Sequence, residues 1–233
     1  MNHAKKTGFT LIELMLAMTF IAFLLVIIAM TTIQISHIYN KGLTLREVNQ
    51  VGRSVSEDLQ RSIGASAPFD VDVSSLTTRY ILNDGGGRLC IGRYSYAWNY
   101  GKSLMGDSGA PAAFNKYDDN TLVRFAKVND ASASLCTDPT RSVPKADATE
   151  MLAAGDRDLA VHKFIVTNAS TDTQSSQALY AISMILGTND QTQLSTGDAS
   201  CRPPAEGNGN EDYCSVNQFD IVVRAGNKSG GDE

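Results

Sequence analysis

The chain carries one long apolar segment near its N-terminus, and this segment limits what the rest of the protein can be. No charged residue occurs from Leu14 to Ser36, a run of 23 positions. As an α-helix, this run would be about 35 Å long, which is enough to cross a hydrocarbon core of roughly 30 Å. Lys5 and Lys6 precede it, and the next Lys or Arg is Lys41. The positive-inside rule therefore predicts a single-pass inner-membrane protein whose head is exported.

Two ordinary explanations of this segment fit less well. A secretory signal peptide has an apolar region of about 7–15 residues, and the run here is longer. A plain membrane anchor leaves Glu13 unexplained, because an acid in the apolar zone costs a few kcal/mol without a partner. A buried carboxylate must be paired or neutral. We therefore expect Glu13 to have a nearby cation as its partner.

The N-terminal string KKTGFTLIELMLA resembles the class III signal of type IV prepilins and type II secretion pseudopilins. The resemblance is firm over residues 5–35 and architectural beyond them. It implies that residues 1–8 are a leader, that prepilin peptidase cuts after Gly8, and that the new amine of Phe9 is methylated. It also implies that Glu13 pairs with the Phe9 amine of a neighbouring subunit and sets the axial register of the helices in a filament.

A second helical pattern continues the first through residues 39–63. Apolar residues recur there at steps of three and four, as on one face of a helix: Leu45, Val48, Val51, Val55, Leu59 and Ile63. The repeat is too short for a free coiled coil, so we expect this stripe to pack on a sheet. Gly64 and Pro68 end the pattern. The prediction is one continuous helix whose transmembrane half is residues 9–38.

Residues 64–233 change to short apolar or alternating runs separated by turn residues, and we expect them to form the exported head. Six strands are predicted, at Thr77–Leu82, Arg88–Ser95, Leu122–Val128, Leu159–Thr167, Leu179–Gly187 and Phe219–Ala225. A short helical turn is predicted at Ala146–Ala154. Strands without intervening helices favour an antiparallel sheet. The expected fold is α+β, with the long helix packed on a mostly antiparallel, pilin-like β-sheet head.

All the cysteines lie beyond the apolar segment, which favours disulfides formed in an oxidising compartment. Three pairings are open for Cys90, Cys136, Cys201 and Cys214. We favour Cys201–Cys214 with Cys90–Cys136, because the first pair brackets the turn-rich stretch CRPPAEGNGNEDYC. Closing a loop of that size would contribute roughly 3 kcal/mol. Four buried free thiols are the alternative.

No pattern for catalysis, metal or cofactor binding is found in the sequence, so we expect a protein that is not an enzyme. His162 lies in a strand-like run and is expected to be structural, and no zinc-site spacing occurs. Acid-rich loops at Asp118-Asp119 and Glu206–Asp212 lack the spacing of a calcium loop. An aromatic run at period two is expected in core or subunit packing, with a surface-binding patch as the alternative: Tyr94, Tyr96, Trp98 and Tyr100.

These observations favour a structural and assembly function, with priming or the tip of the filament as its place. The net charge of −5 argues against a dedicated nucleic-acid binder. The strings DLAVHKFIV, ALYAISMILG and FDIVVRAGN resemble the head of PilW-type minor pilins of the type IV pilus. That resemblance implies other pilins, the prepilin peptidase and methyltransferase, and the inner-membrane assembly platform as partners. A type II secretion pseudopilin, or a tip adhesin or DNA- or cargo-binding module, is the alternative.

Overall fold

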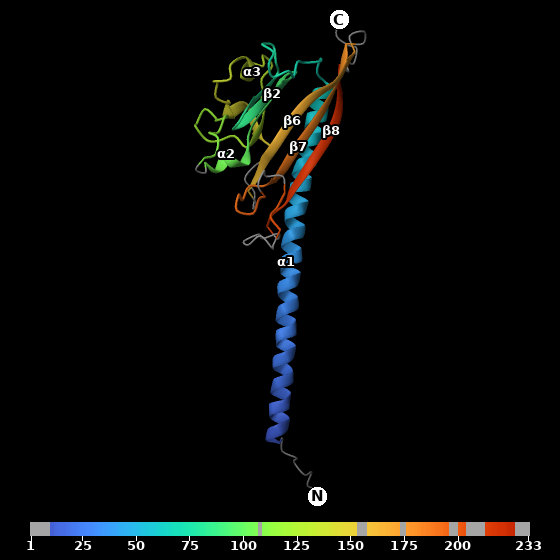
Figure 1. The fold of residues 1–233 in the computed structure, drawn as a ribbon, viewed down its shortest axis with the longest axis vertical. Helices are drawn as coiled ribbons and strands as arrows, with labels where there is room; N and C mark the ends of the chain where they lie inside the picture. The colour runs from blue at the N-terminus through green and yellow to red at the C-terminus, as the bar shows by residue number, and fades with distance from the viewer. Residues whose placement is uncertain are drawn as a thin grey trace.

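A long N-terminal helix and two antiparallel sheets make up the computed structural model, an α+β arrangement. The structure describes residues 10–106, 109–152, 158–172, 176–195, 200–203 and 213–226. Helix α1 spans Leu11–Gly64, 54 residues, or about 80 Å. Figure 1 shows its first half projecting from the head and its second half packed within it. The predicted continuous helix is therefore confirmed, and neither Gly42 nor Gly52 interrupts it.

The sheet beside α1 has three strands in the order β6-β7-β8. Its strands are β6 (Leu159–Asp172), β7 (Gln177–Thr188) and β8 (Val216–Ala225). All neighbours are antiparallel, and α1 contacts β7 and β8. The three strands predicted in this region are present, and each extends beyond the predicted range at one or both ends.

The second sheet is a five-stranded antiparallel meander in the order β1-β2-β3-β4-β5. Its strands are β1 (Tyr80–Asn83), β2 (Gly86–Ile91), β3 (Tyr94–Asn99), β4 (Phe125–Asn129) and β5 (Ala148–Glu150). Three short helical segments lie among them: α2 (Gly101–Met105), α3 (Ser134–Thr137) and η1 (Lys145–Asp147). The head is thus built from two sheets rather than the single sheet that the sequence suggested.

The prediction of one strand over Arg88–Ser95 is wrong, because a hairpin turn divides this stretch into β2 and β3. Ile91 pairs with Tyr94, so the turn consists of Gly92 and Arg93. Gly92 has φ +55°, a left-handed conformation that glycine adopts without steric cost. Because side chains alternate on both sides of the turn, the sequence of this stretch resembles one continuous strand.

The helical turn predicted over Ala146–Ala154 is present only at its start, as η1. Within the described residues, only η1 is helical there, and the chain then extends as β5. Its Glu150 lies opposite Ala126 of β4. Pairing with the edge of the meander therefore overrides the helical preference of the alanines.

The main core lies where α1, the three-stranded sheet and one face of the meander meet. Its largest buried side chains come from all three parts: Leu59, Ile63, Leu89, Tyr96, Trp98, Phe125, Phe164 and Tyr180. The other face of the meander packs on a smaller cluster that includes Ala97, Val123, Val128, Leu135 and Val143. Because both faces are covered, every residue of β2 is buried.

The apolar stripe predicted on α1 is correct except at its start. Val48, Val55, Leu59 and Ile63 are buried in the core, and Val51 is partly buried against it. Leu45 instead remains 38% exposed, and Thr44 is buried in its place. Thr44 lies four residues before Val48, on the face of the helix that meets the head.

The alternative that the aromatic run forms a surface-binding patch is wrong. Tyr96 and Trp98 are fully buried in the main core, and Tyr94 and Tyr100 are half-buried and pack against it. The ring centroids of Trp98 and Phe164 lie 4.4 Å apart. The period-two spacing places these rings on the face of β3 that meets β6 and α1, so they join the parts of the head.

Two disulfides are present, and they are the pairs that the sequence favoured. Cys90 of β2 is bonded to Cys136 of α3, and this bond fastens α3 to the meander. Cys201 is bonded to Cys214, just before β8. The first closes a longer loop, with a sequence separation of 46 against 13, and long loops gain most from closure in the chain-entropy model.

Candidate functional site

The projecting half of α1 is the most unusual surface of the molecule. Its large apolar side chains from Leu11 to Tyr39 are exposed. Apolar surface of this extent marks a site that contacts a membrane or another protein. Among the described residues, this is the one helix long and apolar enough to cross a membrane. Figure 1 shows that this half lies outside the head.

Glu13 lies in the first turn of this helix and forms a capping box with Thr10. The Thr10 amide and hydroxyl each donate a hydrogen bond of 2.9 Å to Glu13 Oε2. The Glu13 amide donates in return to Thr10 Oγ1 at 3.3 Å. These bonds satisfy donors that would otherwise lack partners at a helix N-terminus. Glu13 is therefore held at the N-terminal end of the helix by its contacts with Thr10.

Hydroxyl groups along the apolar half are satisfied within the helix. Thr19 Oγ1 donates to the Leu16 carbonyl at 2.9 Å, and Thr32 Oγ1 donates to the Ile28 carbonyl at 2.8 Å. Thr31 bonds to carbonyls of the preceding turn in the same way. In hydrocarbon each polar group needs such an internal partner, so these threonines are compatible with a membrane span.

The head begins directly where the exposed apolar half ends. Asn40 Nδ2 donates to the hydroxyl of Tyr213 at 3.1 Å, and Asn217 Nδ2 of β8 donates to Asn49 Oδ1 at 2.8 Å. Further along, a Cβ at Gly52 would lie 2.1 Å from the Phe219 ring. The absence of a side chain at Gly52 therefore lets β8 lie close against α1.

A polar joint fastens the meander to the C-terminal part of α1. The Tyr96 hydroxyl is 2.7 Å from both Asp58 Oδ2 and Ser62 Oγ, and Lys127 Nζ donates to Asp58 Oδ1 at 2.9 Å. Lys127 also lies 3.9 Å above the Tyr94 ring. Burial raises the pKa of Tyr96 well above its ordinary value. The hydroxyl therefore stays protonated and donates to the carboxylate.

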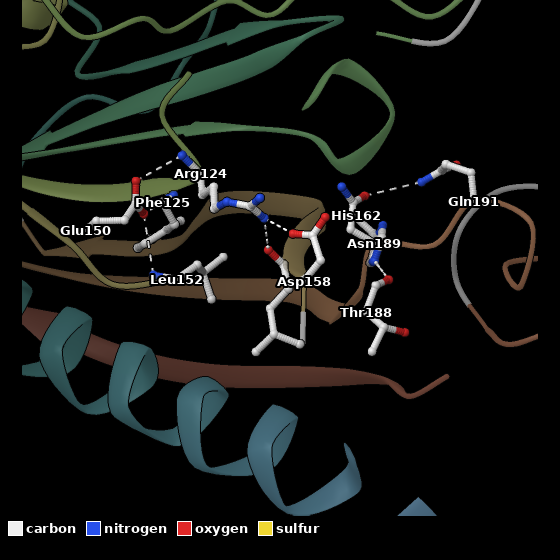
Figure 2. Close-up of polar contacts among 10 residues, drawn as sticks. Arg124, Phe125, Glu150, Leu152, Asp158, His162, Thr188, Asn189 and Gln191 are labelled. Carbon is white, nitrogen blue, oxygen red and sulfur yellow. Dashed lines mark hydrogen bonds and ion pairs between the residues drawn. The ribbon is translucent and has the colours of Figure 1, made fainter. Parts of the chain in front are cut away.

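A second group of ionisable side chains joins the meander to β6 (Figure 2). Glu150 accepts from the amides of Phe125 at 2.6 Å and Arg124 at 3.0 Å, which secures β5 to β4. Arg124 forms an ion pair with Asp158 and donates to the Leu159 carbonyl at 3.0 Å. These contacts hold elements together, and no periodic or spacing signal in the sequence predicts them.

His162 lies at the far side of this group, where β6 meets the end of β7. Its Nε2 is 3.0 Å from the Thr188 carbonyl. A Cβ on Gly101 would lie 3.0 Å from the His162 ring and 2.3 Å from Asn189 Oδ1. The imidazole therefore packs tightly between α2 and the sheet, which agrees with the structural role expected for it.

Of the two acid-rich loops, only Asp118-Asp119 lies within the described part of the chain. No group of three or more His, Cys, Asp or Glu side chains suited to a metal ion occurs there. Asp119 instead bonds to Lys145, and this contact holds the pKa of Asp119 well below its ordinary value. Glu206–Asp212 lies outside the described residues.

The predicted processing site is untested by the fold, because Gly8 and Phe9 lie outside the described residues together with the leader. Comparison with protein-family models, curated proteins and solved structures finds no match to the chain. The exposed half of α1, with Glu13 near its start, is therefore the candidate functional site on its geometry and sequence.

Proposed function

We propose that the chain is a minor pilin-like subunit of a type IV pilus, with a structural role in assembly. In this proposal, prepilin peptidase removes the leader after Gly8 and the amine of Phe9 is methylated. The exposed half of α1 first anchors the subunit in the inner membrane. It then packs against the helices of other pilins, where apolar contacts and the Glu13–amine pair hold the filament together.

The observation that carries the proposal is the separation between the head and the apolar half of α1. The head has its own core, while Leu11–Tyr39 adds a long apolar rod that no part of the described head covers. Such a rod needs lipid or other helices around it. The string around Gly8 and Glu13 adds a cleavage signal and a charge that suit transfer from lipid to a helical bundle.

The capping box refines how Glu13 would act. Both bonds from Thr10 end on Oε2, and within the described residues none of the hydrogen bonds ends on Oε1. A neighbouring amine could therefore pair with Oε1 while Thr10 keeps Oε2. The carboxylate would be partly satisfied before docking and more fully satisfied after it.

The same rod would serve a type II secretion pseudopilin, and the two proposals differ only in the machine. The apolar run from Leu14 to Ser36 lacks both glycine and proline. α1 is accordingly unbroken through it, which suits a minor pilin or a pseudopilin. We place the minor pilin first because the head strands and the chain length resemble that group.

The test follows both processing and assembly. Native protein should begin at Phe9 and carry one methyl group by mass spectrometry, and it should co-purify with sheared pili. A Gly8→Asp precursor should keep its leader and be missing from pili, whereas Gly42→Ala, in open space on the same helix, should be processed normally. Mature-length Gly8→Asp protein would refute the processing step, and exclusive association with a secretion complex would favour the pseudopilin.

A further inference from the structure

The apolar half of α1 and the head are joined without a spacer. Exposed apolar side chains continue to Tyr39, and the next residue, Asn40, already bonds to Tyr213 of the head at 3.1 Å. Thr44, one turn later, is buried and donates to the Asn40 carbonyl at 2.9 Å. A membrane that surrounds the apolar half must therefore lie immediately below this edge of the head.

The length of the helix sets how close the two come. A hydrocarbon core of roughly 30 Å takes about 20 helical residues, and the uncharged run from Leu14 to Ser36 has 23. Asn40 lies four residues beyond Ser36, or about 6 Å along the axis. The headgroup zone on each side of the core is also about 5–8 Å thick, so Asn40 falls within it.

The side chains at this edge suit that zone. Tyr39 is 65% exposed and Tyr213 is 52% exposed. Tyrosine rings concentrate at membrane interfaces because the ring is apolar and the hydroxyl is polar. Tyr213 has a fixed position, since it precedes the disulfide-bonded Cys214 and accepts the hydrogen bond from Asn40.

We propose that Tyr39, Asn40 and Tyr213 form a lipid-contacting base, which rests on the phospholipid headgroups while the subunit is in the membrane. The base would limit how deeply the helix sinks and would hold the head close to the bilayer. The inference rests on the proposed membrane insertion of α1, and the continuity of the base with the apolar half favours lipid over a second protein. When the subunit leaves the membrane for a filament, contacts with protein would replace these contacts with lipid.

The experiment places a tryptophan probe at the base of the full-length chain in vesicles of phosphatidylethanolamine and phosphatidylglycerol. Some of the lipids carry a nitroxide on the headgroup, which quenches nearby tryptophan. Tyr213→Trp tests the base, Tyr39→Trp is the control at the end of the apolar half, and Val222→Trp is the control on the exposed face of β8. The native Trp98 is fully buried, and its emission in the unsubstituted chain is subtracted.

We expect Tyr213→Trp to be quenched about as strongly as Tyr39→Trp and about threefold more than Val222→Trp, which lies 67% exposed on the far side of the sheet. Flotation of the same vesicles checks insertion. If the protein floats but Tyr213→Trp is quenched no more than Val222→Trp, the lipid-contacting base is wrong and insertion stands. Protein that fails to float refutes both. If protection of the tryptophan at position 213 from quenching grows with protein concentration and does not depend on labelled lipid, the base contacts a second copy of the chain and the lipid assignment is wrong.

Discussion

At the scale of single residues, the head depends on buried charged groups that bond to the backbone. Arg88 of β2 is 1% exposed. It donates to the carbonyls of Leu135, Asp138 and Arg141 and to Asn115 Oδ1, at 2.7–3.1 Å. Burial lowers its pKa to about 10, so the group is still charged at neutral pH. One side chain thus holds residues 135–141 against the meander.

Replacing Arg88 should therefore destabilise the head strongly. Arg88→Met leaves all four acceptors without this donor, including those of the buried residues Asn115 and Leu135, and we expect a loss of about 3 kcal/mol in the free energy of unfolding. Urea unfolding of the full-length chain in detergent, followed by fluorescence of its one tryptophan, measures this. Arg141→Met, at an exposed side chain, should change stability by less than about 0.5 kcal/mol. Equal effects would contradict the role assigned to Arg88.

Asp130 should make the head sensitive to acid. Burial raises its pKa, but the amides of Leu135 and Ser134 and the Ser95 hydroxyl outweigh that effect and hold the pKa below its ordinary value. A depressed folded-state pKa stabilises the fold above the unfolded-state pKa, and this stability is lost as pH falls through the folded-state value.

Between about pH 6 and about pH 2, the unsubstituted chain should lose more unfolding free energy than Asp130→Asn, which has no such carboxylate to protonate. Asp147→Asn changes an exposed carboxylate and should follow the unsubstituted chain. Urea midpoints across this pH range measure the difference. Parallel curves for Asp130→Asn and the unsubstituted chain would show that Asp130 contributes nothing to the acid response.

Glu13 should matter for assembly and little for the fold of the head. Glu13→Ala removes the carboxylate that a neighbouring amine would meet, and we expect its amount in sheared filaments to fall about tenfold. Thr10→Ala removes the capping partner, at a cost of about 1 kcal/mol to the helix end, but keeps the carboxylate, so it should assemble better than Glu13→Ala. Immunoblots of filament fractions measure both, and normal incorporation of Glu13→Ala would end the pairing hypothesis.

At the scale of elements, the close approach of α1 and β8 depends on Gly52. Alanine normally stabilises a helix interior by about 1 kcal/mol relative to glycine. At Gly52 the new methyl group would meet the Phe219 ring, whereas at Gly42 nothing lies within 4 Å. We expect Gly42→Ala to be neutral or stabilising and Gly52→Ala to destabilise by about 1–2 kcal/mol. Urea unfolding measures both, and a stabilised Gly52→Ala would mean that β8 can move away freely.

The elements differ in how far the sequence could predict them. The long helix and its buried stripe could be predicted because their signals are local and periodic. The division at Gly92 and the short β5 could not, since they depend on which strand lies alongside. The candidate site followed from the apolar run and Glu13, but Tyr213 could not be linked to Asn40 because 173 positions separate them. The roles of Arg88 and Glu150 could not be predicted either, because the bonds from Arg88 to the Arg141 carbonyl and from the Phe125 amide to Glu150 join positions 53 and 25 apart.

At the scale of the whole molecule, we expect the head to fold without the projecting half of α1. The core takes Val48, Val55 and Leu59 from α1, and none of the described residues before Asn40 belongs to it. A chain that starts at Asn40 should therefore be soluble and unfold within about 1 kcal/mol of the full-length chain. A chain that starts at Gln60 loses that core face and should not fold. Circular dichroism and urea unfolding compare them, and a misfolded Asn40 chain would show that the projecting half supports the head.

The unbroken course of α1 ties the direction of the head to the projecting apolar half of the helix. An α-helix turns about 100° and rises about 1.5 Å per residue, and α1 has no break between Leu11 and Gly64 through which the two ends could rotate independently. The number of residues in the helix thus sets the direction in which the head points around the helix axis. One residue inserted in the projecting half of α1 would leave every contact within the head intact. It would still rotate the head about the helix axis, so that the outer face of the head points toward a different neighbour.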